Sequence, residues 1–194
     1  DEIALRKGQG NYVTLVTGRF RDGEIAILGV LPGHEKAVVV EFLRLIPQRI
    51  LQTIQAVCCD LWEAYTEAVR EEIPTARIVA DRFHVARHYR DAADQIRKTE
   101  LQRLKKELSK EEYQKLNGSF RAFRKNAKDL KKEERKTLRG FFEYAPCAKQ
   151  AYDFREELTV IYDMNLSKKQ AQSKILRWIL QVEESGLQCF DEFI

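Results

Sequence analysis

Residues 54–88 constrain the fold more than any other stretch of this sequence. Two short apolar runs, AVCC and RIVA, are each followed by a segment whose apolar residues lie three and four positions apart, a pattern typical of strand, helix, strand, helix. The first run ends on Asp60 and the second on Asp81. In an open α/β sheet the carboxyl ends of the strands form the edge where ligands and metals bind. The stretch therefore predicts an α/β fold with acids at one sheet edge.

The preceding residues predict three more strands. Residues 11–17 and 24–31 are rich in β-formers, and the Asp-Gly turn pair between them indicates a hairpin. Residues 1–5 resemble the tail of another strand. Residues 34–45 have the apolar spacing of a helix. Together with the two strands of the central stretch, these segments predict a mixed five-stranded sheet whose first strand is truncated.

The chain changes character after residue 108. A long helix is expected over residues 82–108, and beyond it helical patterns continue with no strand-like run. The residues SKKQ at 167–170 fit a capping box that opens a last amphipathic helix. We therefore predict an α/β region over residues 1–108 and an all-helical region over residues 109–194.

The net charge of +4 is unevenly distributed along the chain. Residues 1–80 carry a balance of −2, residues 81–140 a balance of +9, and residues 141–194 a balance of −3. A local excess of this kind is expected of a surface that meets a polyanion such as DNA, although a solvated helical face would give the same pattern. The candidate DNA contacts are Arg121, Arg124, Lys125, Lys128, Lys131, Lys132 and Arg135.

Several common functions are excluded by missing motifs. No GxxxxGK[ST] loop, GxGxxG turn or GxSxG elbow occurs, which excludes the commonest nucleotide-binding and hydrolase sites. The four cysteines lack CxxC spacing and are expected to be reduced and mostly buried. No signal peptide is recognised and no run reaches the length of about 18 apolar residues that a membrane span needs. We therefore expect a cytoplasmic protein with no membrane partner.

Asp1 and Asp60 are the first candidates for chemistry. Two carboxylates at neighbouring strand ends can hold Mg²⁺, and two such ions about 4 Å apart can activate water and stabilise the leaving oxygen of a phosphodiester. Alternatively, Asp60 only caps the helix that follows it. Trp62 and Tyr65 on that helix are predicted to be core residues rather than DNA-stacking residues.

Asp81 belongs to a second motif, D-R-F-H. His84 and His88 lie one turn apart on a helical face, the spacing of paired histidine metal ligands. A zinc site with Asp81 is therefore one alternative. A histidine bonded to a carboxylate, as a structural brace or to orient an active site, agrees better with the absence of a nearby cysteine.

Three segments, DEIALRKGQGNYVTLV, CCDLWEAY and IPTARIVADRFHVARH, together resemble the insertion-sequence transposases of the ISL-three group. The resemblance covers essentially the whole chain. It implies a ribonuclease-H-like fold interrupted by a helical insertion, and DDE-type DNA cleavage and strand transfer at the ends of a mobile element. It also implies two Mg²⁺ or Mn²⁺ ions bound by Asp1 and Asp60, with Asp81 and His84 as a supporting motif. The implied partners are DNA ends, target DNA and further copies of the chain, on the bacterial nucleoid.

One departure from this family concerns the third acid. The family has a glutamate in a stretch resembling N-G-x-x-E-G-x-N-N-K, and the surroundings of Glu183, Glu184 and Glu192 do not match it. The family's N-terminal zinc-binding and helix-turn-helix regions are not recognised either. We therefore expect a central piece of a transposase that is catalytically incomplete by itself. The alternatives are a ribonuclease-H-like nuclease of the resolvase type and a non-catalytic DNA-binding or assembly module.

Overall fold

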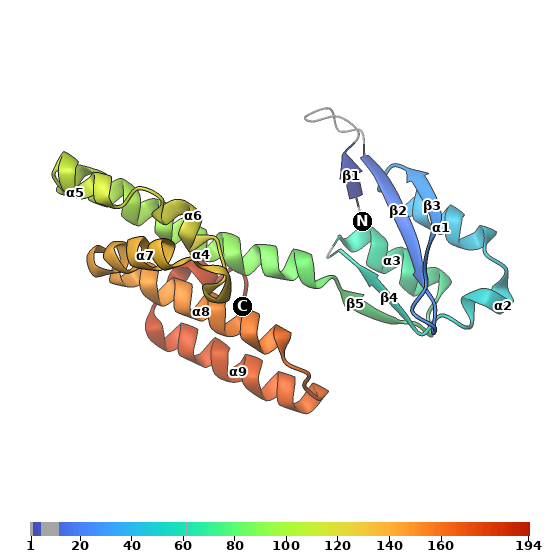
Figure 1. Cartoon of the computed structure of the whole chain (residues 1–194). Coiled ribbons are helices and arrows are strands. Elements are labelled where there is room, and N and C mark those ends of the chain that lie inside the picture. The colour runs from blue at the N-terminus through green and yellow to red at the C-terminus, as the bar shows by residue number, and fades with distance from the viewer. Residues whose placement is uncertain (1, 5–11, 61) are drawn as a thin grey trace. The chain divides into compact units, whose positions relative to one another are not determined.

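The computed structural model describes residues 2–4, 12–60 and 62–194 (Figure 1). The chain divides into two compact units, Asp1–Val85 and Ala86–Ile194. The first unit contains all the described strands and the second is helical, which confirms the mixed α/β class. The functional boundary expected at residue 108 stays a prediction.

The strands of the first unit form two sheets. Strands β1 (Glu2–Ala4), β2 (Tyr12–Arg19) and β3 (Ile25–Pro32) are antiparallel in that order, which confirms the hairpin. Strands β4 (Ala56–Cys59) and β5 (Arg77–Ala80) form a parallel pair. No ladder joins the two sheets among the described residues, so the single five-stranded sheet that we predicted is not shown.

The helices α1 (Lys36–Leu45), α2 (Gln48–Leu51) and α3 (Glu63–Glu72) complete the first unit. Helix α1 packs on β3 and α3. The approach to β3 is close at Gly29, where an added Cβ would lie 2.6 Å from the Phe42 ring. The core consists of apolar side chains from β3 and these helices, with one tyrosine: Leu31, Val39, Val40, Leu43, Leu51, Tyr65, Ala68 and Ile73.

The second unit is built from a series of helices around a separate core. In chain order they are α4 (Arg82–Glu107), α5 (Lys110–Lys115), α6 (Ser119–Phe123), η1 (Ala127–Asp129), α7 (Lys132–Tyr144), α8 (Pro146–Asp163), α9 (Lys168–Ser185) and η2 (Gln188–Phe190). The capping box at Ser167 is confirmed, and α9 stops at Gly186 with a left-handed φ of 70°. The capping box therefore acts as expected, and a glycine in the left-handed conformation is a common end for a helix.

The last residues of the chain close the helical core. Phe190 is fully buried and packs edge-on against Trp178 at 5.6 Å. Trp178 in turn donates its indole N–H to the Phe154 carbonyl at 2.9 Å. The spacing of three between Leu187 and Phe190 suits a 3₁₀ turn, which places such residues on one side.

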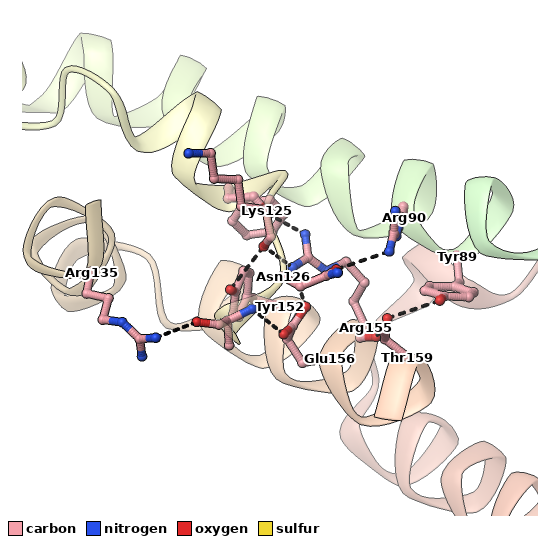
Figure 2. A network of polar contacts seen from close by, with 11 residues as sticks. Tyr89, Arg90, Lys125, Asn126, Arg135, Tyr152, Arg155, Glu156 and Thr159 are labelled. Carbon is pink, nitrogen blue, oxygen red and sulfur yellow. Dashed lines mark hydrogen bonds and ion pairs between the residues drawn. The ribbon is translucent and has the colours of Figure 1, made fainter. Parts of the chain in front are cut away.

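A buried arginine joins α8 to the segment after α6 (Figure 2). Arg155 is 1% exposed, and its guanidinium donates to the carbonyls of Phe123 and, at 2.7 Å, Lys125. It also pairs with Glu156 at 2.6 Å and lies 4.3 Å from the centre of the Tyr152 ring. Burial raises the pKa of Tyr152 to about 12, and the Glu156 carboxylate adds to the increase. Arg155 therefore supplies donors to two backbone carbonyls, and the Lys125 carbonyl also accepts from the Tyr152 hydroxyl at 3.2 Å.

Two further polar contacts involve α4. The Tyr89 hydroxyl lies 3.0 Å from that of Thr159 on α8, so α4 and α8 are joined inside the core (Figure 2). Asp94 and Arg97 form a buried pair at 2.6 Å. Burial by itself would raise the pKa of Asp94, but the hydrogen bond from Arg97 and its charge hold that pKa below the ordinary value of 3.8.

Replacing Arg155 by Met should lower the free energy of unfolding of the helical unit by about 3–5 kcal/mol, because Glu156 and two carbonyls lose their buried partner. Urea unfolding followed by tryptophan fluorescence measures this change when all variants also carry Trp62→Phe, which leaves Trp178 as the one tryptophan. The matched control is Arg177→Met on the exposed face of α9, for which we expect a change within about 0.5 kcal/mol. Equal stabilities of the two variants would contradict the role of Arg155.

Candidate functional site

Asp60 and Asp81 follow β4 and β5 directly. These strands are parallel and pair Cys59 with Ala80, so the two aspartates occupy equivalent positions at the same sheet edge. The Asp81 N–H donates to the Cys59 carbonyl at 2.8 Å, which extends the ladder to the first residue beyond β5. The sheet itself therefore places the two predicted acids next to each other.

His84 lies between the two carboxylates. The Asp81 carboxylate accepts the Phe83 N–H at 2.9 Å, which caps the start of α4 and places His84 in the first turn. There His84 Nδ1 lies 3.0 Å from Asp60 Oδ1, and Nε2 lies 3.8 Å from Asp81 Oδ2. The three side chains are only 20–27% exposed. Asp60, which was predicted to be catalytic, and Asp81, which was predicted to belong to a supporting motif, therefore both contact the imidazole of His84.

Two further candidate ligands, Asp1 and His88, remain to be placed. Asp1 lies outside the described residues, and its role stays a prediction. His88 forms no metal cluster with Asp81 and His84, since the described part of the chain holds no group of three or more His, Cys, Asp or Glu that could bind a metal. The zinc alternative is therefore not found there. The carboxylates of Asp60 and Asp81 remain at this edge. Mg²⁺ is often held by one or two carboxylates together with water.

The cysteines beside this site are less buried than predicted. All four thiols are free, and Cys58 and Cys147 are exposed, so the expectation of mostly buried thiols was wrong. The reason is that one face of β4 is open, and the strand alternation turns Cys58 to it. Partial burial raises the pKa of Cys58, and the Asp81 carboxylate raises it further.

The two aromatic residues of α3 behave differently. Tyr65 is buried, as predicted, but Trp62 is 50% exposed, so its assignment to the core was wrong. Its ring lies 5.7 Å from His34. Spacing correctly places Trp62 and Tyr65 on one side of the helix, but it does not show that Trp62, the N-cap of α3, lies beyond the packed part of that side.

Three of the seven residues predicted to contact DNA form ion pairs or hydrogen bonds inside the helical unit. Lys125 pairs with Glu134 at 2.6 Å, and Lys128 pairs with Asp163 at 3.1 Å. The Arg135 guanidinium donates to backbone carbonyls in the segment before α7. Part of the positive charge of this segment is therefore compensated inside the fold.

The other four lie at or near helix ends. Arg121 is in α6, Arg124 follows it, and Lys131 and Lys132 begin α7. Arg124 also lies over the Phe120 ring at 5.5 Å. All four side chains are exposed, as contact with DNA phosphates requires, and that contact stays a prediction.

Comparison with known proteins decides the family. A family model described as a transposase, that of DDE transposases of the ISL-three group, matches residues 1–194. The chain belongs to this transposase family. No curated protein and no solved structure gives a match. The family confirms the resemblance and implies a DNA-processing enzyme with DNA as its partner. No helix in the described parts of this transposase chain is long and apolar enough to cross a membrane.

Asp81→Asn should speed the alkylation of Cys58 by iodoacetamide near neutral pH. Removing the carboxylate lowers the pKa of this thiol, which increases the reactive thiolate at a given pH. Peptide mass spectrometry measures the rate, and the exposed Cys147 in the same protein is the control. An unchanged ratio of the two rates would show that Asp81 does not act on Cys58.

Proposed function

We propose that this transposase chain carries two of the acids, Asp1 and Asp60, of the centre for metal-dependent DNA strand cleavage and strand transfer at insertion-sequence ends. One observation supports this most: Asp60 and Asp81 both meet His84 at the carboxyl edge of a parallel strand pair. We further propose that the two sheets belong to one ribonuclease-H-like sheet in which β1 lies beside β4, with residues 1–108 as catalytic core and residues 109–194 as helical insertion.

The residues at this edge fit a hard divalent cation. Asp60 offers carboxylate oxygens, and Mg²⁺ is commonly held by one or two carboxylates while it keeps several waters. Asp1 is proposed as a further ligand. Two Mg²⁺ or Mn²⁺ ions bound here would supply activation of the attacking water or 3′-hydroxyl and stabilisation of the leaving oxygen.

The protein's own residues take distinct parts in this proposal. Asp60 binds the metal, and His84 fixes the orientation of the Asp60 carboxylate through its Nδ1 at 3.0 Å. Asp81 positions His84, because its carboxylate caps the helix that carries the imidazole. Asp81 and His84 are thus positioning residues. The non-catalytic alternative predicts that no two of Asp1, Asp60 and Asp81 come close enough to share an ion, which a structure soaked with Mn²⁺ would test directly.

The basic segment is proposed to hold the DNA. Arginine and lysine contacts to phosphates position a protein on the duplex and carry no sequence information directly. The seven residues proposed for these contacts are Arg121, Arg124, Lys125, Lys128, Lys131, Lys132 and Arg135. Assembly of several copies on DNA, on the nucleoid in the cytoplasm, completes the proposal.

Asp60→Asn should reduce strand cleavage by the full-length transposase to background, because a metal ligand is removed. His84→Ala should reduce cleavage by about 10- to 100-fold, the usual effect of removing a residue that orients a ligand. Cleavage of a labelled insertion-sequence end in Mg²⁺ measures both effects. The control is Asp22→Asn in the β2–β3 turn, which should cleave like the wild type. Wild-type cleavage by Asp60→Asn would leave the DNA-binding module as the better explanation.

Binding of duplex DNA by the chain should weaken steeply as salt increases, because phosphate contacts release counterions. The double variant Lys131→Gln, Lys132→Gln should show a less steep fall of log affinity with log salt. The magnitude of the slope should decrease by about 0.9 for each phosphate that the variant no longer neutralises. Fluorescence anisotropy of a labelled duplex measures this slope.

The matched control for that pair is Lys168→Gln with Lys169→Gln, which removes two exposed lysines at the start of α9. We expect the wild-type slope for this variant. If affinity does not change with salt, or if both double variants lower the slope equally, the basic segment does not hold DNA as proposed.

A further inference from the structure

Three aromatic rings form a row in the first unit. Tyr12 begins β2, His34 follows β3, and Trp62 precedes α3, so the rings come from three separate segments. Tyr12 and His34 stack at 5.2 Å with an angle of 10° between their planes. His34 and Trp62 lie 5.7 Å apart at 31°. Tyr12 is 39% and Trp62 is 50% exposed, so both ends of the row keep ring surface open to solvent.

Buried hydrogen bonds hold these segments in place. Thr14 is buried, and its hydroxyl donates to the Gly33 carbonyl at 2.7 Å. Because its one proton is used there, it accepts from the Tyr65 hydroxyl at 2.9 Å. Gly33 in turn donates its N–H to the Tyr12 carbonyl at 3.0 Å. The strand, the turn and the helix that carry the rings are therefore joined by hydrogen bonds, which reduces the backbone freedom that a ligand would have to remove.

The row adjoins the candidate acid site. Trp62 stands two residues after Asp60, whose carboxylate contacts His84. Phe83, on the other side of this site in the chain, is 70% exposed and packs edge-on against His84 at 5.5 Å. Core packing does not account for the aromatic residue Trp62, because the residue on this side of α3 that packs into the core is Tyr65.

We propose that the row formed by Tyr12, His34 and Trp62 is a stacking platform for an unpaired nucleobase of the DNA strand that is being processed. This proposal rests on the proposed function, which places a DNA strand at Asp60. Aromatic side chains and histidine stack on bases, and such stacking tolerates any sequence because every base has a π-face. In a paired duplex the neighbouring bases cover that face, so the platform selects bases that have left the stack.

The charge distribution agrees with a base rather than a phosphate as the ligand. Residues 1–80 carry a net charge of −2, while the positive excess lies in residues 81–140. Stacking on rings needs no positive charge, whereas phosphate contacts do. The chain thus separates the two kinds of contact, with rings beside the acids and basic residues on the helices.

The test compares three labelled DNAs bound by the full chain: a single-stranded oligothymidine, a fully paired duplex and the same duplex with one bulged thymidine. Trp62→Ala should weaken binding of the single strand and of the bulged duplex by about 5- to 150-fold, the usual effect of removing the ring under one stacked base. The paired duplex should bind as to the wild type. Trp62→Phe should keep most of the affinity.

The matched control is Phe20→Ala, which removes an equally exposed ring in the turn between β2 and β3 and should change none of the three affinities. Fluorescence gives a second readout that does not depend on the stability of the alanine variant. Oligothymidine should quench the tryptophan emission of the wild type but not that of Trp62→Phe, because the remaining Trp178 is buried.

Equal weakening of all three DNAs by Trp62→Ala, or no weakening, would overturn the stacking platform. So would equal quenching of the wild type and Trp62→Phe. The proposed function fails by different results, namely wild-type cleavage by Asp60→Asn and duplex binding that does not change with salt. The two failures are therefore distinguishable.

Discussion

The parallel pairing of β4 with β5 is the contact on which the candidate site depends. In-register pairing puts Asp60 and Asp81 at equivalent positions beyond the ladder. The Asp81 carboxylate then caps α4, and the cap sets the turn in which His84 reaches Asp60. A shift of one residue in this pairing would separate the acids and turn every side chain of the shifted strand to the opposite face.

The two units are stabilised in different ways. The α/β unit relies on an apolar core with one buried polar brace at Thr14 and Tyr65. The helical unit adds buried ionic groups, Arg155 with Glu156 and Asp94 with Arg97. Irregular segments between short helices leave carbonyls inside the unit, and an arginine with five donors satisfies several of them at once.

Local signals predicted local structure well. Strand β5 was expected at residues 77–80 and lies there, and the capping box at Ser167 forms as its residues predict. Such features depend on neighbours in the chain. The prediction for Trp62 depended on distant segments and was wrong: its side chain is 50% exposed instead of buried. Periodicity shows which side of an element is apolar, but not how far its partner extends.

The sequence by itself determined the order of strands and helices, the two acids after apolar runs, the location of the positive charge and membership of a transposase family. Only the tertiary structure decided that Asp60, Asp81 and His84 meet, that several basic residues of the DNA-binding candidates bond internally, and that Tyr12, His34 and Trp62 form one row. The physical reason is that these contacts join residues far apart in the chain. Their distances are set by strand register and helix packing, which no local pattern encodes.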